Sequence, residues 1–219
     1  GKGLMGVINN LQDPDVLEVL GLLDMDFVIL DGEHTPLTAE TAQTLYRAAE
    51  IRDLCVMTRI GESSRQVVQK FLDAGSQGVL IPMVNTKQDA QQVVDSVMYP
   101  PIGKRGLAAV RAADYGLTKD LAEYVKMAND EMLVAIQIET LEAVDNFDDI
   151  ASVNGIDVIF FGPSDLSSSL GVPGQARHPK VISLIERLGK KTVKCGMAAG
   201  TIARDVKQYA YWRERGFQL

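Results

Sequence analysis

The sequence predicts an α/β fold, a (β/α)8 or TIM barrel, on three observations. Short apolar runs recur along the 219 residues, segments with helical periodicity separate them, and polar residues collect where the runs end. Runs of this length that do not alternate polar and apolar residues are typical of strands buried on both faces of a parallel sheet. Seven strand–helix pairs and an eighth strand candidate favour a barrel over an open doubly wound sheet, which usually has fewer strands.

The expected strands are short and rich in Val, Ile, Leu and Met. They cover residues 4–8, 26–30, 54–60, 78–84, 132–139, 157–162 and 195–200, with 216–219 as the eighth candidate.

The expected helices begin at side chains that accept hydrogen bonds from free backbone N–H groups. These starts are Asp13 followed by Pro14, Ser63 with Gln66 as a capping box, Thr86, and Thr140. Gly155 is expected to end the helix that begins at Thr140.

One segment breaks the alternation. Residues 99–117 form a long expected loop before the helix that carries Leu121 and Tyr124, and loops of this length are usually lids or interface arms. The chain also stops at Leu219, where the last strand should finish. We therefore expect the eighth helix to be absent from this chain and one flank of the barrel to be uncovered.

Composition indicates a single domain over residues 1–219. Hydrophobic residues make up 46% and charged residues 23%, with no linker or charge block between them. A formal net charge of -7 argues against a nucleic-acid partner, because phosphate binding needs concentrated Lys and Arg. The two cysteines, Cys55 and Cys195, have no metal-binding or redox spacing, so we expect buried free thiols.

No secretory signal or membrane span is expected. The N-terminal residues lack a basic segment followed by an apolar stretch, and the apolar runs are far shorter than the roughly 20 residues that cross a bilayer. We expect a cytoplasmic protein with a small-molecule partner, and neither nucleic acid nor membrane.

Polar side chains follow four of the expected strands. In a barrel of this kind the catalytic groups lie at the C-terminal ends of the strands, so we expect these residues at one rim. They are Asp31, Glu33 and His34 after the second run, Arg59 at the end of the third, Gln137 and Glu139 at the end of the fifth, and Ser164 and Asp165 after the sixth.

The four carboxylates of this rim face a single arginine. Unpaired ions cost several kcal/mol each to desolvate, so such a cluster stays hydrated, shifts its pKa values or holds a cation. A divalent metal fits, with Mg2+ first and Mn2+ or Co2+ as alternatives. Taken alone, each of the four acids also has a structural explanation as a helix-capping or loop acid, and His34 as the start of a helix. Arg59 is harder to explain in this way, because a guanidinium at the end of an apolar strand needs partners. We expect a structural role for His178, which stands beside Pro179 at a helix start.

Four blocks of the sequence resemble the HpcH/HpaI aldolases, a family of metal-dependent class II pyruvate aldolases that cleave 4-hydroxy-2-oxo acids. The resemblance extends from about Gly3 onward. Its blocks are DFVILDGEHTP, IPMVNTKQDAQQVVDSVMYPPIGKRG, IQIETLEAVDNFDDIASVNGIDVIFFGPSDLSSSLG and GMAAG.

The resemblance implies a barrel of the phosphoenolpyruvate/pyruvate type that assembles as a hexamer by exchanging eighth helices. It implies that Glu139 and Asp165 hold the metal and that Arg59 stabilises an enolate. It further implies that His34 works with Asp31 in proton transfer and that Gln137 lies near the substrate.

These residues lead to one functional hypothesis. The chain is expected to be an aldehyde-lyase that reversibly cleaves a 4-hydroxy-2-oxo acid to pyruvate and an aldehyde through a metal-bound enolate. His34, with its ring oriented by Asp31, is the expected base for the C4 hydroxyl proton, and Glu33 is expected to pin Arg59. The groups expected to bind the substrate are Arg59, Gln137 and the turn with Gly162, Ser164 and Asp165. The alternatives are an oxaloacetate decarboxylase or acyl-CoA-type lyase on the same site, and a non-catalytic barrel.

Overall fold

The computed structural model describes residues 3–219 and has the expected α/β fold. It divides into two compact units. The N-terminal unit comprises Met5–Ile81 and Gln92–Val134, and the C-terminal unit comprises residues 3–4, Pro82–Gln91 and Ala135–Leu219. The strands of the described residues follow the sheet order β1 to β7. The single domain expected from composition stays a prediction.

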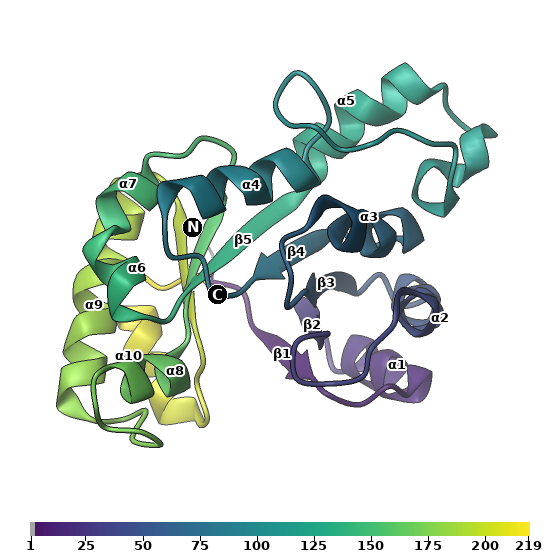
Figure 1. Cartoon of the computed structure of the whole chain (residues 1–219). Coiled ribbons are helices and arrows are strands. Elements are labelled where there is room, and N and C mark those ends of the chain that lie inside the picture. Colours follow the sequence, from purple (N-terminus) through teal and green to yellow (C-terminus); the bar gives the residue numbers. More distant parts are fainter. Residues whose placement is uncertain (1–2) are drawn as a thin grey trace. The chain divides into compact units, whose positions relative to one another are not determined.

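The N-terminal unit contains four strands that pair in parallel, each with its sequence neighbour. Helices α1, α2 and α3 lie side by side along them (Figure 1). The elements are β1 (Gly6–Asn9), α1 (Pro14–Leu22), β2 (Phe27–Asp31), α2 (Ala39–Glu50), β3 (Cys55–Arg59), α3 (Arg65–Ala74) and β4 (Gly78–Ile81). Strand β2 is buried along its whole length, as its apolar run predicts.

Two helix starts of this unit illustrate what capping signals can and cannot predict. The Asp13 carboxylate accepts a hydrogen bond from the Asp15 N–H, and Pro14 opens α1, as expected. The capping box at Ser63 is wrong, because the N-cap of α3 is Ser64, without a side-chain capping bond. Ser63 instead accepts hydrogen bonds from the side chains of Gln92 and Ser96. A contact with a distant helix therefore replaces the local one.

Residues 99–131 form an arm with a small core of its own. The arm contains the 3-10 helix η1 (Arg111–Gly116) and helix α5 (Leu121–Glu131), and Tyr99 packs edge-on against Tyr124. The Arg105 guanidinium lies over the Tyr99 ring, and its Nη2 lies 3.0 Å from the Asp73 carboxylate on α3. This buried ion pair ties the arm to α3.

The C-terminal unit contains strands β5, β6 and β7, which also pair in parallel. Helix α9 packs along β6 and β7, beside α8 (Figure 1). The elements are α4 (Lys87–Val97) and β5 (Leu133–Ile138), each of which has a part in either unit, then α6 (Leu141–Asp145), α7 (Phe147–Ala151), β6 (Val158–Phe161), α8 (Pro163–Ser169), α9 (Pro179–Lys194), β7 (Ala198–Thr201) and α10 (Val206–Glu214).

Several expectations for this unit need correction. The helix that begins at Thr140 breaks at Asn146, because Asn146 leaves the helical conformation. Its second part, α7, ends at Ala151, before Gly155. Residues 216–219 form no strand, although the Gln218 N–H donates to the Ala199 carbonyl at 2.8 Å. Cys195 is exposed rather than buried, since it caps the C-terminus of α9.

One other expectation agrees with the structure. The His178 ring caps α9, with Nδ1 accepting from the Lys180 N–H, which is the structural role expected for it. Within residues 3–219, no helix has both the length and the apolar character needed to cross a membrane.

Candidate active site

The first group of candidate residues lies at the C-terminal ends of β2 and β3 in the N-terminal unit. Asp31 and Arg59 are register partners on these parallel strands. Arg59 Nε donates to Asp31 Oδ1 at 2.9 Å and Arg59 Nη2 donates to Asp31 Oδ2 at 2.6 Å. Both residues are buried, so the strands themselves bring a charged, bidentate pair together and shield it from water.

The turn after β2 wraps its backbone around the Asp31 carboxylate. Oδ1 accepts from the N–H groups of Glu33 and His34, and the Thr35 hydroxyl donates to the Asp31 carbonyl. Burial by itself would raise the pKa of Asp31, but the hydrogen bonds and charge of Arg59, with these two N–H groups, hold that pKa below its ordinary value. Asp31 is therefore a fixed anion that anchors both the turn and the guanidinium.

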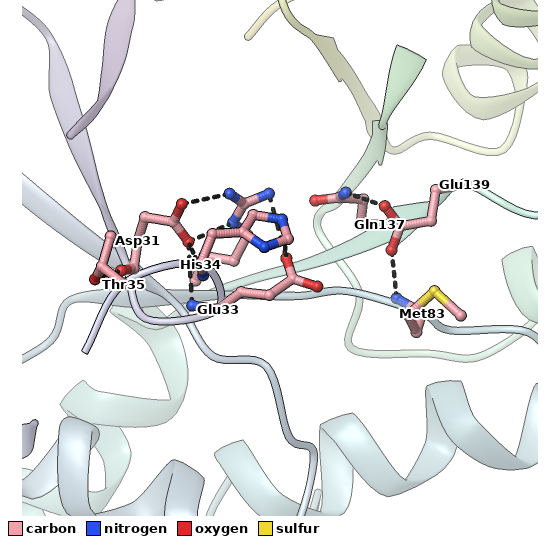
Figure 2. A network of polar contacts seen from close by, with 8 residues as sticks. Asp31, Glu33, His34, Thr35, Met83, Gln137 and Glu139 are labelled. Atoms are coloured by element: carbon pink, nitrogen blue, oxygen red, sulfur yellow. Dashed lines mark hydrogen bonds and ion pairs between the residues drawn. The ribbon is translucent and has the colours of Figure 1, made fainter. Parts of the chain in front are cut away.

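Glu33 and His34 complete this group. Glu33 Oε2 lies 3.3 Å from Arg59 Nη1, so Glu33 pins the guanidinium as expected. His34 Nε2 lies 3.6 Å from Glu33 Oε2, and the imidazole is 61% exposed. Figure 2 shows Asp31, Glu33 and His34 at this turn. The expectation that Asp31 orients the imidazole needs correction: Asp31 contacts the His34 backbone, and the ring contacts Glu33.

The second group lies in the C-terminal unit, where β5 ends. Gln137 and Glu139 are two residues apart and both are buried. Glu139 Oε1 accepts from the Met83 N–H at 2.7 Å, and Glu139 Oε2 contacts Gln137 Nε2, as Figure 2 shows. Gln137 Oε1 is buried with no hydrogen-bond partner among the residues described. A buried acceptor left without a donor indicates a place for a donor from outside the chain.

Gly162 follows β6 and lies directly against this group. A Cβ at Gly162 would lie 2.8 Å from Gln137 Nε2 and 2.9 Å from Glu139 Oε2, so a larger residue there would displace the ends of these two side chains. Asp165, in the first turn of α8, is exposed three residues later, after Ser164. The ends of the neighbouring strands β5 and β6 thus supply one carboxylate each.

These oxygen atoms fit a hard divalent cation. Within residues 3–219 there is no set of three or more His, Cys, Asp or Glu side chains arranged to hold a metal ion by themselves. The two carboxylates, of Glu139 and Asp165, match an ion such as Mg2+, which prefers oxygen ligands and keeps several waters or substrate oxygens.

The structure brings the expected residues together within each unit. Asp31, Glu33, His34 and Arg59 form one group, and Gln137 and Glu139 form the other with Gly162. That the two groups share one site stays a prediction. Met83 was missed, because its contact comes from the backbone N–H and a left-handed φ of 55°, which no apolar pattern signals.

Comparison with known proteins gives a family match over nearly the whole chain. The family model for HpcH/HpaI aldolase/citrate lyase matches residues 5–219. A hydroxypyruvate/pyruvate aldolase from Sagittula stellata is 37% identical over 206 residues, which are 94% of this chain and 80% of the relative. A 2-keto-3-deoxy-L-rhamnonate aldolase from Klebsiella pneumoniae is 38% identical over 207 residues, which are 94% of this chain and 76% of the relative.

A solved structure has a similar fold. The crystal structure of an HpcH/HpaI aldolase from Desulfitobacterium hafniense DCB-2 superposes with a TM-score of 0.94 and is 33% identical in sequence. The similarity covers 100% of this chain and 85% of the other.

Proposed function

Because the chain belongs to the HpcH/HpaI aldolase/citrate lyase family, we propose that it cleaves a 4-hydroxy-2-oxo acid reversibly to pyruvate and an aldehyde with the help of a divalent metal ion. The chain is an enzyme of the aldehyde-lyase class. The observation that carries the proposal is the Arg59 guanidinium, which Asp31 and Glu33 hold in one orientation. In the other unit, Gln137 Oε1 beside Glu139 is buried without a hydrogen-bond partner among the described residues, which supports a ligand there.

Glu139 and Asp165 are the residues that would hold the ion, preferably Mg2+, with Mn2+ or Co2+ as alternatives. When bound, the ion supplies Lewis acidity that polarises the 2-oxo group. The unsatisfied Gln137 Oε1 accepts a hydrogen bond from a bound water or from the substrate. The first turn of α8, with Gly162, Ser164 and Asp165, receives the substrate carboxylate.

Arg59 supplies a fixed positive charge where the enolate oxygen develops negative charge. The guanidinium needs no reorganisation during the reaction, because Asp31 and Glu33 already hold it from two sides.

His34 is the proposed base for the C4 hydroxyl proton, directly or through a water. Its exposed imidazole can reach solvent and exchange the proton, and Glu33 stabilises the imidazolium that forms. Asp31 acts on the same reaction by holding Arg59 and the His34 backbone.

The proposal extends to the domain, the assembly and the substrate of the protein. We propose that residues 1–219 fold as one barrel domain of the phosphoenolpyruvate/pyruvate type and that the protein works as a homo-oligomer. Its substrate partner is a small 2-oxo acid.

A metal-supplemented retro-aldol assay tests the function. The purified protein is given 4-hydroxy-2-oxo acids of different length and charge, with pyruvate release as the readout and an EDTA-treated sample as the control. Pyruvate release that stops with EDTA and returns with Mg2+, Mn2+ or Co2+ is the expected result. Full activity after complete metal removal would exclude the metal-dependent reaction.

The family description also covers citrate lyases, so two other reactions remain candidates for the same site. An acyl-CoA-type lyase or an oxaloacetate decarboxylase would use the same enolate chemistry. The same assay with oxaloacetate and with malyl or citramalyl thioesters separates them, because only the favoured substrate should be turned over at low concentration.

A further inference from the structure

The buried carboxylate of Glu139 is held by a loop as well as by its own strand. The loop, residues 82–86, joins β4 to α4 and lies in the C-terminal unit with Glu139. Pro82 and Val84 are buried, whereas the Met83 side chain between them is 53% exposed. The part of Met83 that reaches inward is the backbone N–H, which donates to Glu139 Oε1 at 2.7 Å (Figure 2).

Met83 adopts a backbone conformation that is uncommon for a residue with a side chain. Its φ of 55° lies in the left-handed region, where a non-glycine residue persists only if its surroundings impose the conformation. This conformation aims the Met83 N–H at the carboxylate. Asn85, two residues further along the chain, carries hydrogen bonds that fasten the loop.

Asn85 fastens the loop to the segment that follows Glu139. Asn85 Oδ1 accepts from the Thr140 hydroxyl at 2.5 Å, and the Asn85 carbonyl accepts from Asn146 Nδ2 at 2.9 Å. On its other side, the N–H groups of Asn85 and Thr86 donate to Asp89 Oδ2 at the start of α4. The part of the loop that follows Met83 is therefore fastened by hydrogen bonds to two segments, the one after Glu139 and the start of α4.

We propose that Met83 and Asn85 are positioning residues for metal binding: the Asn85 contacts hold the loop so that the Met83 N–H fixes the Glu139 carboxylate in the orientation that receives the ion. The inference rests on the proposed function, because it takes Glu139 as a metal ligand. Groups that orient a ligand typically change metal affinity about 10–100-fold when they are removed. Met83 thus acts through its backbone, and the chemical nature of its side chain is secondary.

Substitutions at Met83 should give an order of Mn2+ affinities that distinguishes a role of its backbone from a role of its side chain. Met83→Gly keeps the N–H and tolerates positive φ, so it should bind Mn2+ as tightly as the unchanged protein. Met83→Val keeps an apolar side chain, but a β-branched residue strongly resists this conformation, so the Kd for Mn2+ should rise about 10-fold or more. If the side chain mattered instead, valine would be the better replacement.

Asn85→Ala tests the fastening of the loop. It removes the acceptor of the Thr140 hydroxyl, and we expect the Kd for Mn2+ to rise about 10-fold. Thr192→Val is the matched control, because it removes a buried hydroxyl hydrogen bond in the same unit, the one to the Leu188 carbonyl within α9, and leaves the contacts of the loop in place. The control should lower the urea midpoint without changing the Kd for Mn2+.

The measurement is Mn2+ titration of the full chain by calorimetry, with urea unfolding of each variant to confirm that it folds. Glu139→Gln distinguishes a failure of this inference from a failure of the proposed function on which it rests. If the unchanged protein fails to bind Mn2+, or Glu139→Gln binds it normally, both are overturned. If Glu139→Gln loses Mn2+ while Met83→Val and Asn85→Ala bind it as tightly as the unchanged protein, the proposed function stands and the positioning role is overturned.

Discussion

At the scale of single residues, the best-defined feature is the guanidinium of Arg59. Asp31 binds it bidentately and Glu33 binds its remaining nitrogen, Nη1. A buried cation with two carboxylate partners is held in one orientation, which is what stabilising a developing charge requires. This arrangement makes the role of Arg59 directly testable.

Replacing Arg59 with Ala should lower kcat for pyruvate release by about 100-fold or more, because the stabilising charge is lost from the transition state. Mn2+ binding should persist, since the proposed ligands are Glu139 and Asp165. Arg59→Lys is the matched variant. It keeps the charge but loses the bidentate geometry, so its kcat should lie between those of the unchanged protein and Arg59→Ala. Undiminished cleavage by Arg59→Ala would refute the role.

Part of this site could be predicted from the sequence. Asp31 and Arg59 end two neighbouring apolar runs, and parallel strands bring such ends together, so their proximity follows from the pattern. The pairing of Glu33 with Arg59 was predicted and is confirmed. The predicted orientation of the His34 ring was wrong, because the ring position depends on how the turn folds around the Asp31 carboxylate.

At the scale of elements, the strands were predicted to within a few residues and the helix ends less well. Strands β2 and β3 coincide with their apolar runs because both faces are buried. Helix ends depend on single hydrogen bonds. At Ser63 a tertiary contact with Gln92 and Ser96 replaces the expected cap. Contacts of this kind join residues far apart in sequence, so local signals do not encode them.

The arm of residues 99–131 depends on one buried ion pair. The Arg105 side chain is only 1% exposed, and its Nη2 is paired with Asp73 on α3. Asp73→Ala would leave this guanidinium buried without its carboxylate, which should lower the free energy of unfolding by about 3–5 kcal/mol. Urea unfolding at pH 7 measures the change.

Glu18→Ala is the matched control for that measurement. It breaks a surface pair with Arg52 in the same unit, whose side chains are each 36% exposed, so the cost should stay below about 1 kcal/mol. Equal effects of the two variants would show that burial of the Asp73–Arg105 pair contributes nothing to holding the arm.

At the scale of the whole molecule, the fall in the free energy of unfolding at acid pH should depend in part on Asp31. The pKa of Asp31 is below its ordinary value of about 3.9 in the folded chain, so ionised Asp31 stabilises the fold above that pH. The contribution is lost as the pH falls from about 3.9 toward the folded pKa. Compared with Asp31→Asn, the unchanged protein should be more stable by a constant amount from pH 7 to about pH 5.

Below that range the difference between the two proteins should shrink, because protonated Asp31 resembles asparagine in charge. Urea midpoints at a series of pH values measure this difference. A difference that grows on acidification would contradict the sign assigned to Asp31.

The overall plan of the chain was more predictable than its details. Alternating apolar runs and helical stripes indicated the parallel α/β fold, and the order β1 to β7 agrees with it. The role of residues 216–219 was less predictable. Gly216, with φ of 86°, turns the chain after α10 so that Gln218 bonds beside β7 without forming a regular strand.

The central claim is that Glu139 and Asp165 jointly bind one divalent ion. Anomalous diffraction from a crystal soaked in Mn2+ tests it most directly, with an Asp165→Asn crystal as the control. The account predicts a single strong anomalous peak within coordination distance of both carboxylates, lost in the control. A peak elsewhere, or none at all in a crystal that retains its fold, would contradict it.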